Sequence, residues 1–203
     1  MRLIYTDADT DPKAVPNAVK HLKKFRSKIS CTEVTQNKHQ WWRLHRPRKL
    51  SVFKRSKIIG VTTSRKIELV YDKEGDLIVT DAMYVFGVRS GIPVEFVLGL
   101  MQSSPFAEFY RLGNQGDGRV IPQVKARKLL EVPLPRWDRS NETHKALVKI
   151  VRALMTLSAS DAPGAARSFM AQRRELDALA RKIYGVSDLP LDTDDAMALL
   201  LPD

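Results

Sequence analysis

The chain has 203 residues, 43% of them hydrophobic and 28% charged, which excludes a disordered polymer and predicts one sizeable core or one domain with an appendage. Residues 1–137 carry 25 Lys and Arg against 13 Asp and Glu, whereas residues 138–203 carry 9 against 10. The basic excess therefore indicates a polyanionic partner for the first part only. A lone cysteine, Cys31, excludes an internal disulfide. The N-terminus lacks the apolar core of a signal peptide, and no apolar run approaches the ~20 residues of a membrane helix, so we expect a cytoplasmic protein.

A helix is predicted from about Pro16 to Ile29. Its apolar residues recur at three- and four-residue spacing, and lysines lie elsewhere around it. One face of this helix should therefore pack while the other stays solvated.

The tract from Lys38 to Lys66 carries ten Lys or Arg residues and no Asp or Glu. Short β-type runs lie between the charges, at Trp41–Leu44, Ser51–Phe53 and Lys57–Val61. Basic side chains interleaved with aromatic ones on strands favour nucleic-acid binding, and the alternative is a solvated basic face with core tryptophans. Because successive strand residues point to opposite faces, at most one of the adjacent Trp41 and Trp42 should face DNA.

Further strands are predicted at Lys66–Tyr71, Leu77–Thr80 and Met83–Val88. The acidic segment Asp72–Asp76 between the first two is typical of a hairpin loop with Gly75 at its turn. Two core-facing helices should follow, one over Pro93–Met101 and one capped by Ser103, Ser104 and Pro105.

The glycine-rich stretch Leu112–Val120 must be a loop. It carries Asn114, Gln115 and Arg119, side-chain types that contact adenine or guanine edges in a major groove, although a plain polar loop has the same composition. A short edge strand is predicted over Leu129–Pro135.

Two long helices should form an antiparallel hairpin at the end of the chain. The first begins at Ser140 or Asn141, and the second runs from about Ala165 to Tyr184 and stops at Gly185, with Ser158–Gly164 as the connector. Their narrow apolar stripes suggest docking onto another helical element. An acidic tail follows from Ser187 to Asp203.

Motifs of catalysis are missing from the sequence. There is no phosphate-binding loop, no nucleophile elbow and no Asn/Asp-Pro-Pro-aromatic tetrapeptide for a flipped base, and the histidines are scattered. We expect no catalytic residues and no metal site in this chain. A metal-dependent nuclease centred on Asp72 and Asp76 is the enzymatic alternative, with carboxylates drawn from Glu68, Asp72, Glu74, Asp76 and Asp81.

The order of motifs resembles the target-recognition domain of restriction-modification proteins. It runs from HLKKFRSKI through WWRLHRPRK, KIIGV, VEFVLGLMQSSPFAEFY and LLEVPLP to ELDALARKIYGV, over about Pro16 to Val186. It is similar to the C-terminal specificity domain of TaqI-like and type IIG adenine-specific DNA methyltransferases, which is related to type I specificity subunits. The resemblance implies a chain that reads a short duplex sequence and is not catalytic by itself. It also implies a methyltransferase domain or subunit as partner, with S-adenosylmethionine and Mg²⁺ serving the parent enzyme rather than this chain.

By position in that family, the tract from Arg43 to Lys57 would bind phosphates and the Leu112–Arg127 region would read bases. The predicted DNA-binding residues are Arg43, Arg46, Arg48, Lys49, Lys54, Arg55, Lys57, Arg65, Asn114, Gln115, Arg119, Gln123, Lys125 and Arg127.

The predicted fold is α+β, a twisted and mostly antiparallel sheet with short packed helices and then a C-terminal helical hairpin. The predicted division is an N-terminal loop and basic helix (1–30), a DNA target-recognition domain (31–137) and a helical spacer or docking arm with an acidic tail (138–203). The remaining alternative is a protein-interaction module whose hairpin mediates oligomerisation, as a dimer through the C-terminal helices.

Overall fold

The computed structural model describes residues 3–29, 31–114, 123–160 and 162–187 and confirms the α+β class. Its contacts divide the chain into an N-terminal unit, Met1–Val52, and a C-terminal unit, Phe53–Asp203. This division differs from the predicted boundaries after residues 30 and 137, and each unit is described by itself below.

The N-terminal unit contains two short helices, α1 (Pro16–Lys23) and α2 (Thr32–Thr35). The predicted helix to Ile29 was too long, because beyond Lys23 the backbone N–H groups of Lys24 and Phe25 donate to carbonyls three residues back, as in successive turns. The predicted strand at Trp41–Leu44 is also wrong. That segment is a turn, and the backbone N–H of Leu44 donates to the carbonyl of Thr6 (3.0 Å).

The C-terminal unit is built on a three-stranded antiparallel sheet of β1 (Lys57–Val61), β2 (Leu69–Asp72) and β3 (Met83–Phe86), in the order β2-β1-β3. A single helical turn, α3 (Leu50–Phe53), stands where a strand over Ser51–Phe53 was predicted. Leu77–Thr80 forms no strand, so the acidic segment after β2 does not close a hairpin. Instead β2 and β3 both pair with β1, and the connection between them must pass from one side of β1 to the other.

One face of the sheet carries the core. Ile58, Leu69 and Tyr84 share this face by register and belong to the main apolar cluster with Phe96, Leu100 and Phe106. Gly60 lies between Leu69 and Tyr84 on the same face, and a Cβ built there would coincide with the Tyr84 ring. The absence of a side chain at Gly60 therefore lets the Tyr84 ring pack across the central strand.

We expect Gly60→Ala to lower the free energy of unfolding by about 1–3 kcal/mol, because the Tyr84 ring must shift within a close-packed core. Urea unfolding measures this loss. Gly113→Ala is the matched control, since Gly113 is exposed and has an ordinary helical φ of −72°. Equal stability of the two variants would contradict the role assigned to Gly60.

Five helices complete the C-terminal unit. They are α4 (Val94–Met101), α5 (Ser104–Leu112), α6 (Ala126–Glu131), α7 (Glu142–Ser158) and α8 (Ala165–Tyr184). Four of them confirm the predictions, including the Asn141 cap, whose side chain accepts from the N–H groups of Thr143 (2.9 Å) and His144 (3.3 Å). The predicted strand over Leu129–Pro135 is wrong, since α6 occupies its first half and extended chain follows.

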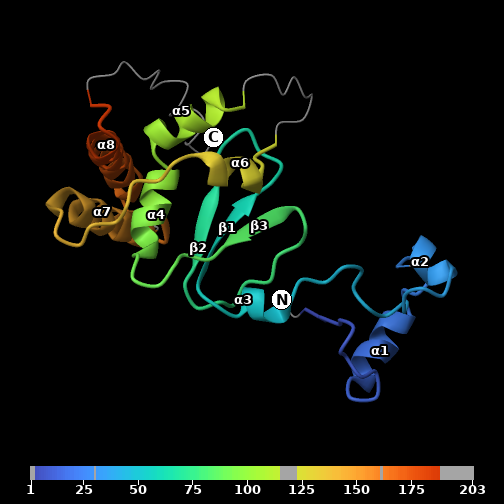
Figure 1. Ribbon diagram of the computed structural model, residues 1–203. Helices are drawn as coiled ribbons and strands as arrows, with labels where there is room; N and C mark the ends of the chain where they lie inside the picture. Colours follow the sequence, from blue (N-terminus) through green and yellow to red (C-terminus); the bar gives the residue numbers. More distant parts are fainter. Residues whose placement is uncertain (1–2, 30, 115–122, 161, 188–203) are drawn as a thin grey trace. The chain divides into compact units, whose positions relative to one another are not determined.

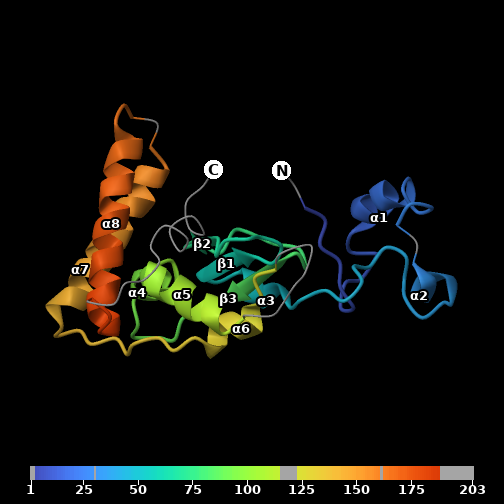
Figure 2. The same ribbon diagram turned by 90° about the horizontal axis from the view of Figure 1, so that it is seen from above.

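The C-terminal hairpin of α7 and α8 is part of the core of this unit. Figures 1 and 2 show α4 between the sheet and the hairpin. Leu147, Val151 and Leu176 are buried, so the apolar stripes are covered within the unit. Asp177 on α8 accepts hydrogen bonds from the backbone N–H and the hydroxyl of Ser104, both at 2.6 Å, which ties the hairpin to the start of α5. Among the described residues, no helix is long and apolar enough to cross a membrane.

Candidate nucleic-acid interface

The connection after β1 and the described end of the predicted base-reading region meet at one end of the sheet. β1 ends at Val61, and the carbonyl of the next residue, Thr62, accepts from the backbone N–H of Val124 (2.8 Å). Arg65, which is exposed, lies in the connection from β1 to β2. The hydrogen bond between Thr62 and Val124 therefore joins the connection that holds Arg65 to the segment before α6, although the two are far apart in sequence.

Tyr110 of α5 organises the residues beside this junction. Its hydroxyl accepts from the backbone N–H of Lys125 (3.0 Å), and its carbonyl accepts from the Asn114 side-chain amide (2.7 Å). Lys125 and Asn114 are half-buried. Asn114 satisfies a carbonyl at the end of α5 with one amide N–H, and its second N–H and its side-chain oxygen are the groups left for a base. Gln123 is exposed, whereas Gln115 and Arg119 lie outside the described residues.

Arg127 is a strongly exposed basic residue at the start of α6. Its side chain is 93% exposed, and its Nε lies 3.6 Å from the Glu131 carboxylate one turn along α6. A pair this exposed is worth little energetically and is easily exchanged for a phosphate. Arg127 is therefore free to turn toward an approaching polyanion.

A second basic group lies at the opposite end of β1. Lys54 and Arg55 are exposed and precede this five-residue strand, which at about 3.3 Å per residue separates the two ends by roughly 16 Å. The guanidinium of Arg55 lies against Gly87, where an added Cβ would stand 3.4 Å from its Nη2 atom. The predicted residues of this unit thus form two groups rather than one continuous face.

Lys57 does not belong to either group. It is 1% exposed, forms an ion pair with Asp72 across the β1–β2 ladder and donates to the carbonyl of Phe53. Its ammonium group is therefore unavailable to phosphate, and the sequence prediction for this residue is corrected. The alternation along β1 that places Ile58 in the core turns Lys57 to the other face, where Asp72 lies directly opposite.

Besides its ion pair with Lys57, Asp72 stabilises the turn after β2. Its two carboxylate oxygens also accept from the backbone N–H groups of Gly75 (3.0 Å), Asp76 (3.2 Å) and Leu77 (3.0 Å), and Gly75 has a φ of +75°. Burial alone would raise the pKa of Asp72, but the hydrogen bonds from Lys57 and from the turn hold this pKa below its ordinary value. The carboxylate is thus a structural anion enclosed by donors.

This enclosure weighs against the nuclease alternative. Both oxygens of Asp72 are already occupied, and Glu68 accepts from the Ser64 hydroxyl (2.7 Å). Within the described ranges no group of three His, Cys, Asp or Glu side chains could hold a metal ion. Asp72 and Glu68 therefore have hydrogen-bond partners within the fold.

In the N-terminal unit, the predicted basic residues differ in availability. Arg46 and Lys49 are exposed and Arg48 is half-buried. The guanidinium of Arg43 lies 4.9 Å from the Trp42 ring centroid and its Nε is buried, so this side chain is partly committed to packing. Arg26 lies 5.3 Å from the Trp41 ring centroid, a cation–π contact that the sequence analysis missed.

The two tryptophans differ in exposure, as the alternation argument expected, but for another reason. Trp42 is only 8% exposed, whereas Trp41 is half-buried, and both lie in a turn rather than on a strand. Trp42 is held by its carbonyl, which accepts from the Thr6 hydroxyl (2.7 Å). Both rings thus lie beside an arginine, but of the two only Trp41 is partly exposed.

No protein-family model matches the sequence, and a search of the curated proteins finds no significant match. Chemically, the arrangement offers guanidinium and ammonium groups on exposed loops beside polar amide side chains. Such groups can neutralise phosphates and donate to base edges.

Proposed function

We propose that this chain recognises a short sequence in double-stranded DNA, as the specificity domain of a restriction-modification adenine DNA methyltransferase. The observation that carries the proposal is the hydrogen bond from the Val124 N–H to the Thr62 carbonyl, which joins the connection that holds Arg65 to the described segment 123–125 of the base-reading region. A basic loop and a polar loop held side by side can bind the backbone and base edges of one duplex segment.

The residues divide into two roles in this proposal. Arg65, Gln123, Lys125 and Arg127 stand at the sheet end expected to face the bases, while Lys54 and Arg55 at the other end bind phosphates. Arg46, Arg48 and Lys49 supply further cations from the N-terminal unit. The methyltransferase domain or subunit would bring S-adenosylmethionine, with Mg²⁺ for any fused nuclease, and the complex would act in the cytoplasm.

The direct test is fluorescence anisotropy of the whole chain with a randomised duplex pool over a salt series, followed by sequencing of the bound fraction. We expect the logarithm of the affinity to fall with the logarithm of salt concentration, at a slope of about −0.9 per phosphate contact. An enriched short motif in the bound DNA supports sequence-specific recognition.

Two other results would redirect the proposal. Binding without an enriched motif would leave a phosphate-binding unit whose specificity needs its partner. Failure to bind duplex at low salt, together with a dimer in solution, would favour the protein-interaction module instead. The hairpin is a weak candidate for that contact, because Leu147, Val151 and Leu176 are already buried within the unit.

A further inference from the structure

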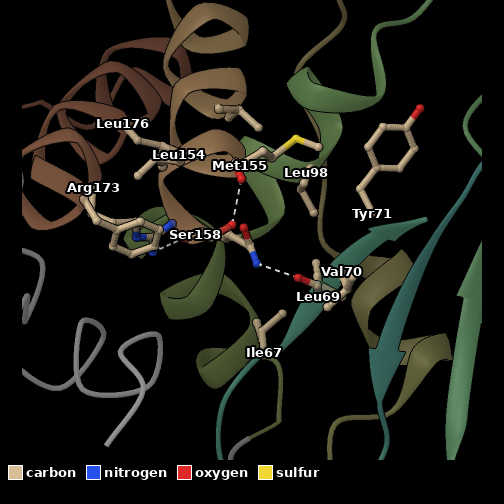
Figure 3. A pocket seen from close by; sticks show the side chains of 13 residues that line it. Ile67, Leu69, Val70, Tyr71, Leu98, Leu154, Met155, Ser158, Arg173 and Leu176 are labelled. Atoms are coloured by element: carbon tan, nitrogen blue, oxygen red, sulfur yellow. Dashed lines mark hydrogen bonds between the residues drawn. The ribbon is translucent and has the colours of Figure 1, made fainter. Parts of the chain in front are cut away.

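A cavity of about 410 Å³ lies beside β2, bounded by α4, α7 and α8, and none of the predicted DNA-binding residues lines it. Its volume falls within the roughly 300–1,000 Å³ typical of small-molecule sites. Apolar side chains dominate its walls, among them Leu98 of α4, Leu154 and Met155 of α7 and Leu176 of α8 (Figure 3). The cavity therefore suits an apolar ligand body.

One wall carries a buried cation. Arg173 of α8 is 6% exposed, and its Nη2 donates to the carbonyl of Gln102 (2.7 Å). A guanidinium has five N–H donors, and a neutral carbonyl accepts from only one of them here. Among the described residues, no carboxylate oxygen lies within ion-pair distance of Arg173.

The acidic residue one turn along α8 from Arg173 is committed elsewhere. Asp177, one turn away, accepts from Ser104 and from the Nε of Arg181 (3.1 Å). Burial lowers the pKa of Arg173 and the charge of Asp177 raises it, but a guanidinium stays protonated in proteins. Burying a cation without a paired anion destabilises the fold, so an anionic ligand group beside Arg173 would be stabilised in this cavity.

The open edge of β2 also borders the cavity, but a peptide strand is a poor occupant. The N–H of Val61 donates to the carbonyl of Glu68 (3.4 Å), so by alternation Leu69 and Tyr71 direct their backbone groups away from β1. The Gln102 side-chain amide already donates to the Leu69 carbonyl (3.0 Å), as Figure 3 shows. Gln102 thus blocks the ladder where an added strand would pair.

We propose that this cavity binds a small amphipathic carboxylate, with its aliphatic or aromatic body among the apolar walls and its carboxylate on Arg173. Arg173 forms charge-assisted hydrogen bonds with the carboxylate, and a guanidinium fork matches both oxygens. The site is independent of DNA recognition.

The test titrates the whole chain with decanoate, below its critical micelle concentration, by isothermal calorimetry. Decanol is the matched ligand, since it has the same apolar body without the carboxylate. We expect saturable one-to-one binding of decanoate that is at least tenfold tighter than that of decanol. No binding of decanoate, or equal binding of the two ligands, overturns the proposal.

Arg173→Met tests the cation, and Arg174→Met, the same change at the exposed neighbouring residue, is its control. The first variant should lose at least tenfold in decanoate affinity, whereas the second should keep wild-type affinity. A ligand-binding role also predicts that Arg173→Met melts no lower than the wild type without ligand, because it removes an unpaired buried charge. Unchanged decanoate affinity in Arg173→Met would contradict the assignment.

Met155→Trp fills the cavity from α7 without touching Arg173 and guards against misfolding of the first variant. We expect a folded Met155→Trp chain to release no binding heat with decanoate and to bind duplex DNA as the wild type does. A folded variant that still binds decanoate with full affinity would place the ligand elsewhere. Since the DNA titration is a separate measurement, failure here leaves the proposed DNA recognition standing.

Discussion

Replacing Asp72 with Asn should lower the free energy of unfolding by about 3–5 kcal/mol, because it leaves the ammonium of Lys57 buried and unpaired. The amide also presents one acceptor oxygen instead of two to the N–H groups of Gly75 and Leu77. Urea unfolding followed by circular dichroism measures the change. Asp76→Asn is the matched control, since the Asp76 side chain is exposed, and it should stay within about 0.5 kcal/mol of the wild type.

The double variant Lys57→Met, Asp72→Asn separates the stabilisation due to the ion pair from that due to the hydrogen bonds of the turn. Once the ammonium is gone, the loss caused by Asp72→Asn should be smaller than in the wild-type background, by about 0.5–3 kcal/mol. Additive losses would show that Lys57 and Asp72 do not stabilise each other. A chain in which Asp72→Asn costs nothing would contradict the structural role and revive a functional one for this carboxylate.

The same pair sets a direction for pH dependence. The pKa of Asp72 is lowered in the folded chain, so the unfolded state takes up the proton first as pH falls. The stabilisation from Asp72 is complete above the ordinary carboxyl pKa of about 3.9 and is lost as the pH falls through the lower folded pKa. The stability difference between wild type and Asp72→Asn should therefore shrink on acidification below about pH 4. A stability difference between the two chains that grows on acidification would contradict a lowered pKa for Asp72.

Arg65→Ala should weaken specific duplex binding by about 1–3 kcal/mol if Arg65 donates to a guanine edge, and the enriched motif should lose information at one base pair. Arg65 is exposed in the connection from β1 to β2, which the hydrogen bond between Thr62 and Val124 joins to the predicted base-reading region. Anisotropy with the enriched duplex and with a scrambled duplex measures both affinity and specificity.

Arg55→Ala and Arg174→Ala are the comparison variants for this prediction. Arg55 is assigned to phosphate, so its loss should weaken all duplexes alike and reduce the salt slope by about 0.9. The change Arg174→Ala removes the same charge from an exposed face of α8, and it should alter neither the duplex affinity nor the salt slope. If Arg65→Ala behaves like Arg174→Ala, the sheet end is not the DNA-binding surface.

Periodicity and capping predicted the helices of the C-terminal unit well. The α7 helix has a side-chain cap at Asn141, α8 ends at Gly185 with a φ of +69°, and both have apolar stripes at helical spacing. These signals are local, so they remain readable without the tertiary structure. β1 was equally readable, since four of its five residues are buried and few polar residues interrupt it.

The pairing of strands was harder to predict from the sequence. The acidic turn after β2 has the composition of a hairpin loop, yet the partner of β2 is β1, which precedes it in the chain. Residue composition predicts where a chain turns, but it does not predict which strands pair with each other. The segment Leu129–Glu131 was read as a strand because its apolar run is too short for periodicity to distinguish the two structures.

Of the candidate site, Lys54, Arg55, Arg65 and Arg127 are exposed, and their DNA contacts stay a prediction. Lys57 was misjudged because its charge was counted without considering which face of the strand it occupies. Arg173 was missed for a related reason. Phe169, Arg173, Leu176 and Ala180 recur at four-, three- and four-residue spacing, so Arg173 stands within the apolar stripe of α8. A charged residue in such a stripe was the available signal.

The packing of α7 and α8 against α4 and α5 has a consequence for grafting the C-terminal unit onto another protein. A fragment cut after Trp137 would expose the apolar sides of α4 and α5 and lose the Asp177 contact at the start of α5. The smallest graft that keeps its own interior intact runs from Phe53 through Val186. Chimaeras joined within the segment before α7 should aggregate, whereas those that carry the hairpin along should express as folded protein.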